Sequence, residues 1–118
     1  MRFTVVGVGA RAQLYTHAIL GAQHCDDCAL VGLCDTNRAR LAHHNALLAA
    51  AFGSAPVPCY AAERFEVMLA EQRVDVVVVC TVDAAHAEYV VRALEAGCDV
   101  ICEKPVATTA QDCRRIIE

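Results

Sequence analysis

The sequence predicts an α/β fold in which a doubly wound parallel sheet has the strand order 3-2-1-4-5. Strand-like apolar runs alternate with helical segments along the chain, and a turn with two glycines, over residues 7–9, leads from the first strand into the first helix. Residues 74–80 are mostly valine, which is typical of a strand buried on both faces. Because strand–helix–strand crossovers are right-handed, this alternation requires a parallel sheet with its ligand crevice above strands one and four.

The individual elements follow from where apolar residues, glycines and capping residues fall. We expect strands at residues 3–6, 29–34, 59–60, 74–80 and 99–102. We expect helices at residues 11–21, 37–51, 63–72 and 84–96, and Gly97 would end the fourth of them. Thr108 or Thr109 would cap a last helix that reaches Glu118. Since no repeat or linker interrupts this series, residues 1–118 are expected to form one domain.

The composition argues against several classes of protein. The net charge of −4, without a basic cluster, argues against a nucleic-acid partner. The longest apolar runs have the length of a strand, well below the roughly 18 residues of a membrane helix, and the N-terminus does not resemble a signal peptide. Of the eight cysteines, four lie in or beside apolar strands: Cys34, Cys80, Cys98 and Cys102. They are therefore expected to be reduced thiols of a cytoplasmic protein, without disulfides.

The turn after the first strand has the G-x-G-x-x-A form of a dinucleotide-binding fingerprint. Gly7 permits the tight turn, Gly9 lets the backbone approach a pyrophosphate, and Ala12 lets the helix pack closely on the strand. Ala10 and Arg11 stand at the helix N-terminus, where free N–H groups and the helix dipole favour phosphate. In this context the motif predicts a Rossmann-type domain that binds NAD or NADP. A glycine turn that merely packs is the alternative.

Asp35 ends the second strand roughly 20 residues after the turn, which is the spacing of the acid that holds the adenosine ribose. Its carboxylate would accept from both ribose hydroxyls and would repel a 2′-phosphate, so we expect NAD in preference to NADP. The alternative for Asp35 is a helix cap, a role that Thr36 or Asn37 could equally fill. Arg38 could lie over the adenine, contact a 2′-phosphate or be solvated.

Two further segments lie on the ligand side of the predicted sheet. Thr81 follows the fourth strand and His86 falls in the first turn of the next helix, so both are expected near the cofactor, although a lone histidine is often structural. Lys104 follows the fifth strand, and Pro105 restricts it to an extended conformation. Lys104 is therefore the candidate catalytic residue, as a hydrogen-bond or proton donor, and Glu103 would balance its charge beside the cofactor. A surface lysine in a loop is the alternative.

The segment Cys25-Asp26-Asp27-Cys28, preceded by His24, has the composition of a metal or redox site. The predicted topology places it between the first helix and the second strand, away from the ligand crevice. A zinc site would also need another close pair of ligands, which the sequence lacks. We therefore expect an ordinary surface turn that holds no metal.

Taken together, these motifs resemble the Gfo/Idh/MocA family of oxidoreductases. The resemblance rests on the glycine turn, on Asp35, on His86 in its alanine-rich helix start, and most specifically on residues 95–105, which end in Glu-Lys-Pro. It implies that Lys104 lies between nicotinamide and substrate and that His86 lies near the cofactor. The segment before His86 departs from the family, which usually has Pro and Asn where this chain has Val82 and Asp83.

The resemblance also implies an activity: hydride transfer between NAD(P) and a sugar, polyol or related hydroxy compound, in an enzyme that forms homo-oligomers. Arg11 is similar to the arginine of members with a G-x-G-x-R turn, some of which resemble NAD-dependent glycosidases, so a glycosidase is a second hypothesis. A non-catalytic nucleotide-binding module is a third. Family members carry a second α/β domain that builds the substrate pocket. Residues 1–118 are therefore expected to be the cofactor-binding part of a longer enzyme and to be inactive alone.

Overall fold

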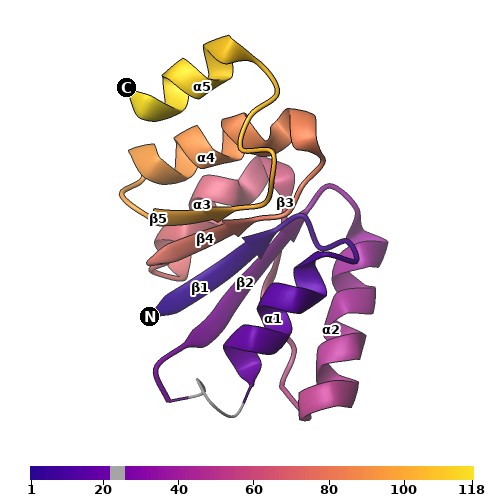
Figure 1. Cartoon of the computed structure of the whole chain (residues 1–118). Helices are drawn as coiled ribbons and strands as arrows, with labels where there is room; N and C mark the ends of the chain where they lie inside the picture. Colours follow the sequence, from indigo (N-terminus) through magenta and orange to yellow (C-terminus); the bar gives the residue numbers. More distant parts are fainter. Residues whose placement is uncertain (22–25) are drawn as a thin grey trace.

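Five parallel strands form one sheet in the order β3-β2-β1-β4-β5, which confirms the predicted topology (Figure 1). The computed structural model describes residues 1–21 and 26–118. The strands are β1 (Arg2–Val6), β2 (Ala29–Asp35), β3 (Cys59–Ala61), β4 (Val76–Val79) and β5 (Asp99–Cys102). Since β1 and β4 are neighbours in the sheet although β2 and β3 lie between them in the chain, the strand order reverses between β1 and β4. This is the point at which open α/β sheets bind ligands.

Helices cover both faces of the sheet (Figure 1). On one face lie α1 (Ala12–Leu20) and α2 (Arg38–Phe52), and on the other lie α3 (Phe65–Glu71) and α4 (His86–Glu95), while α5 (Ala110–Ile117) packs beside α4. Two short 3₁₀ turns, Ala62–Arg64 and Asp83–Ala85, lead into α3 and α4. Each face of the sheet has its own core cluster, so the molecule has three layers.

The valine run of β4 shows why this strand is central. Its four residues are between 0% and 3% exposed. Val77 and Val79 belong to the core beneath α3 and α4, whereas Val78 belongs to the core beneath α1 and α2. Because side chains alternate along a strand, only an apolar residue at every position buries both faces. The residues that follow β4 are therefore held firmly at the carboxyl edge of the sheet.

Several elements are shorter than the sequence predicts. β4 spans four residues rather than seven because its ladder with β1 runs only from the Phe3–Val76 pair to the Val6–Val79 pair. The helices expected at residues 63–72 and 84–96 each begin with a 3₁₀ turn, so α4 starts at His86. Helix termini commonly tighten into such turns.

The capping residues determine where the helices begin and end near the site. The Asn37 side chain accepts hydrogen bonds from the Ala39 and Arg40 amides at 2.9 and 3.3 Å and caps α2. Gly97 follows α4 with a φ of 82°, as expected for its predicted role. Thr109, one of the two predicted candidates, caps α5. Because Asn37 is the N-cap of α2, Asp35 is not needed for that purpose.

Candidate functional site

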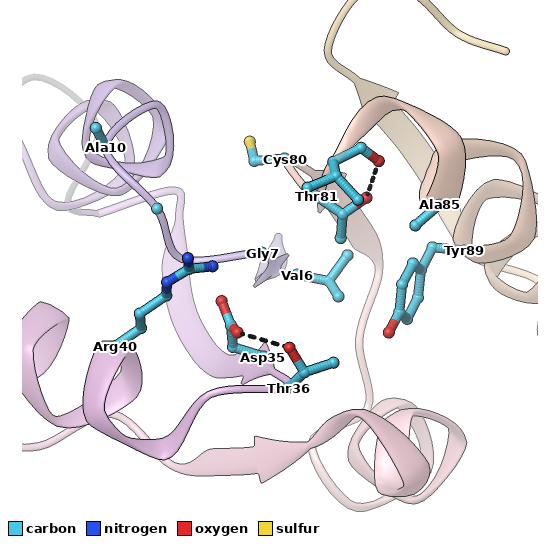
Figure 2. Close-up of a pocket in the computed structure, with 12 residues that line it drawn as sticks. Val6, Gly7, Ala10, Asp35, Thr36, Arg40, Cys80, Thr81, Ala85 and Tyr89 are labelled. Atoms are coloured by element: carbon cyan, nitrogen blue, oxygen red, sulfur yellow. Dashed lines mark hydrogen bonds between the residues drawn. The ribbon is translucent and has the colours of Figure 1, made fainter. Parts of the chain in front are cut away.

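A cleft with a volume of about 440 Å³ opens at the carboxyl ends of β1, β2 and β4 (Figure 2). Its walls are the residues that follow these strands, together with the first turns of α2 and α4. They are Val6, Gly7, Gly9, Ala10, Asp35, Thr36, Arg40, Cys80, Thr81, Val82, Ala85 and Tyr89. The cleft therefore lies where the strand order predicts a ligand.

The two glycines of the turn meet different surroundings. Gly7 has a φ of 83°, and a Cβ added there would lie 2.5 Å from the Thr81 nitrogen, so no other residue fits without a shift. A Cβ added at Gly9 would meet no atom of residues 1–21 and 26–118 within 4 Å. Ala12 is fully buried in the core beneath α1, which agrees with its predicted packing role. Gly7 is thus required by the fold, whereas Gly9 leaves open space beside the cleft.

The start of α1 presents free backbone donors. The amides of Ala12, Gln13 and Leu14 donate to the carbonyls of the turn at 3.2 to 3.4 Å. Within the described part of the chain, the Gly9, Ala10 and Arg11 amides donate to no protein acceptor. Gly9 and Ala10 also line the cleft. Unpaired N–H groups at a helix N-terminus form a site for an anion.

Asp35 is held at the bottom of the cleft by backbone donors. Its Oδ2 accepts from the Val8 amide at 2.9 Å and its Oδ1 from the Asn37 amide at 2.8 Å, and the residue is 6% exposed. Thr36 makes a longer contact of 3.4 Å from its hydroxyl to Oδ1. A carboxylate has about four acceptor positions, so capacity remains for a donor from a ligand. The same contacts link the glycine turn rigidly to the end of β2.

Several residues that line the cleft are missing from the set predicted from the sequence, and Arg40 and Tyr89 are the two with the largest polar side chains. Arg40 reaches from the first turn of α2 toward the glycine turn, while Tyr89 lies on the opposite side, on α4 (Figure 2). Arg38, the predicted arginine, is exposed and lies outside the cleft lining. The choice between the two arginines depends on the N-cap at Asn37, which sets the rotation of α2. Tyr89 could have been found from its spacing: it follows Ala85 by four residues, which places both residues on the helix face that lines the cleft.

The end of β4 forms the wall of the cleft that faces the glycine turn. Thr81, which the sequence places near the cofactor, lines the cleft, and its hydroxyl donates to the Val82 carbonyl at 3.2 Å (Figure 2). Burial raises the pKa of the neighbouring Cys80 thiol to about 12. Cys80 is therefore an uncharged thiol at neutral pH and lacks the thiolate needed for nucleophilic chemistry.

His86 stands behind this wall rather than in it. The residue is 1% exposed and is absent from the cleft lining. Its Nδ1 lies 2.6 Å from the Pro105 carbonyl oxygen and its Nε2 lies 3.0 Å from the Thr81 carbonyl oxygen. Both ring nitrogens thus face protein carbonyls. In this arrangement His86 can act on a bound cofactor only through the segments that it contacts.

Lys104 is exposed at the carboxyl end of β5, beside the cleft but outside its lining. Glu103, which precedes it, is engaged by α1: the Tyr15 hydroxyl donates to Glu103 Oε1 at 2.7 Å, and Arg11 Nε lies 3.5 Å from the same oxygen. The hydrogen bond from Tyr15, followed by the Arg11 charge, lowers the pKa of Glu103. The same hydrogen bond raises the pKa of Tyr15 to about 12. Glu103 and Arg11, both predicted to contact cofactor, are thus paired with each other.

The sequence predicts neither a metal site nor a membrane-spanning helix. Within residues 1–21 and 26–118, no cluster of three or more histidine, cysteine or acidic side chains could hold a metal ion. His24 and Cys25 lie outside the described residues. The helices that the structure describes are all too short or too polar to cross a membrane.

Comparison with known proteins agrees with this fold. The family model described as "Oxidoreductase family, NAD-binding Rossmann fold" matches residues 1–118. D-glucoside 3-dehydrogenase of Escherichia coli K12 is 36% identical over 120 residues, which cover 100% of this chain and 31% of that protein. Inositol 2-dehydrogenase of Pseudomonas savastanoi pv. phaseolicola is 47% identical over 51 residues, or 43% of this chain and 15% of that protein.

A solved structure gives the same result. The WlbA dehydrogenase from Bordetella pertussis, determined in complex with NADH and UDP-GlcNAcA, superimposes with a TM-score of 0.76 and 32% sequence identity. The match covers 99% of this chain and 33% of that one. The chain therefore spans about a third of the length of the relatives that it matches from end to end.

Proposed function

This chain belongs to the Gfo/Idh/MocA family of oxidoreductases as an NAD-binding Rossmann domain, and we propose that it binds NAD for a dehydrogenase acting on a sugar or polyol. The observation that carries the proposal is the cleft above β1 and β4, which is lined both by the free Gly9 and Ala10 amides and by the buried Asp35 carboxylate. When bound, the nicotinamide of such a cofactor accepts or returns a hydride. The remaining tasks belong to the residues of the chain.

The cleft residues fit two parts of a dinucleotide, the pyrophosphate and the ribose of its adenosine. The Gly9 and Ala10 amides would hold the pyrophosphate, since none of the residues that the structure describes occupies the space next to Gly9. Asp35 would accept from the ribose hydroxyls with its remaining acceptor capacity. A 2′-phosphate would meet the Asp35 carboxylate as a like charge, which favours NAD over NADP. Arg40 is the cationic residue in the cleft that would oppose this preference.

The sugar or polyol substrate is proposed from the relatives. The E. coli relative is named as a dehydrogenase of D-glucosides and the Pseudomonas relative as a dehydrogenase of inositol. Both names denote oxidation of a carbon that carries a hydroxyl group. We extend this substrate class, without a specific member, to the protein that contains this chain.

Lys104 is proposed as the residue that holds or moves the proton of the substrate hydroxyl. It follows β5 at the ligand edge of the sheet, directly beside the strand whose end lines the cleft. An ammonium group can donate a hydrogen bond to a carbonyl or alkoxide oxygen and can exchange a proton with it. The cytoplasmic location and the homo-oligomeric state inferred from the sequence also stay proposals.

The test is a combined binding and turnover experiment on the intact protein. Calorimetric titration should show tighter binding of NADH than of NADPH, and sugars and polyols, including myo-inositol and a D-glucoside, should drive the appearance of NADH. Absence of NADH binding would disprove the cofactor assignment. Binding without turnover of any such compound would favour the non-catalytic module. Release of the aglycone from a glucoside without accumulation of NADH would favour the glycosidase.

A further inference from the structure

His86 connects two segments that are far apart in the sequence and adjacent in the fold. Its Nδ1 contacts the carbonyl of Pro105, 19 residues further along the chain, and its Nε2 contacts the carbonyl of Thr81 at the end of β4. The ring is almost completely buried. It therefore lies between the wall of the cleft and the loop that carries Lys104.

The chemistry of these contacts defines what the ring must do. A carbonyl oxygen only accepts hydrogen bonds, so each contact needs an N–H from the ring. A neutral imidazole has one N–H and can donate to one carbonyl at a time, whereas the cationic ring can donate to both. The contact with Pro105 is the shorter one, at 2.6 Å against 3.0 Å for Thr81. Donation from Nδ1 to the Pro105 carbonyl is therefore the interaction by which the ring holds the loop.

Lys104 itself has an exposed side chain, but the residues on either side of it are anchored. The Glu103 amide donates to the Val79 carbonyl at 3.0 Å, and the Glu103 side chain accepts from Tyr15. On the other side, Pro105 is held by His86. Because a residue before proline is confined to extended conformations, fixing both neighbours fixes the direction in which Lys104 leaves the backbone.

We propose that His86 is a positioning residue for Lys104, and that it acts by donating a hydrogen bond from Nδ1 to the Pro105 carbonyl. His86 then affects turnover without touching cofactor or substrate. The inference rests on the proposed function, since it assumes that the placement of the Lys104 amine matters for the reaction. It differs from the sequence-based expectation, in which His86 would contact the cofactor directly.

Two substitutions separate the two contacts of the ring. In His86→Asn the amide nitrogen occupies the position of Nδ1, so the donor to Pro105 is kept. In His86→Gln the amide nitrogen occupies the position of Nε2, so only the donor to Thr81 is kept. Misplacing a catalytic group by about an ångström can cost up to roughly 100-fold in rate. We therefore expect His86→Asn to stay within about 3-fold of wild-type kcat and His86→Gln to lose about 10- to 100-fold, with the KM for NAD unchanged in both.

A chemical readout keeps this test separate from the test of the proposed function. Lys104 is the only lysine among the 118 residues. An amine-reactive acylating reagent therefore modifies one lysine in this segment, and the rate at which the peptide containing Lys104 is acylated reports on that side chain alone. We expect this rate to be near wild type in His86→Asn and altered in His86→Gln. If Lys104→Met retained full turnover, the catalytic role of Lys104 would fail, whereas the acylation rates would still report on His86.

Three results would overturn the proposal. The first is equal behaviour of the Asn and Gln variants in both kcat and acylation rate. The second is a parallel loss of NADH affinity in His86→Gln, which would place the ring at the cofactor. The third is unfolding of His86→Gln, seen as a collapse of Tm, which would make the histidine a purely structural residue.

Discussion

The two sides of the cleft are built in different ways. On the side of β1 and β2, the glycine turn and Asp35 are joined through backbone amides, and the carboxylate is almost fully buried. On the side of β4 and β5, Lys104 is exposed, and its neighbours are held by side chains from α1 and α4, one of them 88 residues away in the chain. The first side is thus rigid through its own backbone, whereas the second depends on tertiary contacts. Substitutions on the first side should change binding or folding, and those on the second should change turnover.

The largest effect is expected at Lys104. Lys104→Ala should lower turnover by roughly two to four orders of magnitude and leave NADH affinity within about 2-fold, because it removes a proton-transfer group and no binding contact. Steady-state kinetics and calorimetry on the same preparation measure both effects. Lys104→Arg is the matched control, since it keeps the charge and cannot release its proton near neutral pH. Near-normal turnover in Lys104→Ala would reduce Lys104 to a surface residue.

The next largest effect is expected in the glycine turn, where Gly7 should matter for folding and Gly9 for cofactor binding. Gly7→Ala should lower the free energy of unfolding by about 2 to 6 kcal/mol, because the added Cβ collides with the end of β4 at a positive φ. Gly9→Ala should leave stability nearly unchanged, since its Cβ enters open space, and should weaken NADH binding instead. Chemical denaturation and calorimetry separate the two. Equal stability of the two variants would contradict this division of roles.

A smaller effect is expected from the charge at the bottom of the cleft. Asp35→Asn should shift the ratio of NADPH to NADH affinity toward NADPH by about 10-fold, which corresponds to roughly 1.4 kcal/mol, because the repulsion of a 2′-phosphate disappears. Adding Arg40→Ala to this variant should reverse much of the shift, since the 2′-phosphate of NADPH would then lose Arg40 as a cationic partner. Titration of both cofactors into the single and double variants measures the ratio of the two affinities. An unchanged ratio in Asp35→Asn would remove Asp35 from cofactor selection.

The smallest effect concerns the contact between α1 and the Lys104 loop. The hydrogen bond to Glu103 raises the pKa of Tyr15 to about 12. A group whose pKa is raised by folding stabilises the folded state below its unfolded pKa, near 10 for tyrosine, and loses that contribution as the pH rises toward 12. Tyr15→Phe should therefore lower Tm by about 2 to 4 °C at neutral pH, with the difference from wild type vanishing in strong alkali.

A control for this last prediction is Glu103→Gln, which keeps an acceptor for Tyr15 and removes the charge. Folding lowers the pKa of Glu103, so its contribution is present above the unfolded pKa and is lost as the pH falls through the folded value. The Gln variant should therefore remove the acid-side dependence. A Tm difference for Tyr15→Phe that stays constant from neutral to alkaline pH would contradict the assigned hydrogen bond.

The sequence by itself determined the topology, the glycine turn and the position of Asp35. These depend on local signals: valine at every position of a strand buried on both faces, glycine where φ must be positive, and an acid at the end of a strand. Cap positions were also within reach, because Asn37 and Thr109 contact amides two or three residues away.

Only the tertiary structure decided which side chains enter the cleft and which hold it together. Arg40 rather than Arg38 faces the cleft, because the rotation of α2 is set by its cap and by its packing on the sheet. His86 turns both nitrogens to backbone carbonyls, and Glu103 turns to Tyr15 and Arg11, since burial and pairing satisfy these groups within the protein. Such contacts join residues distant in sequence, and no local pattern encodes them.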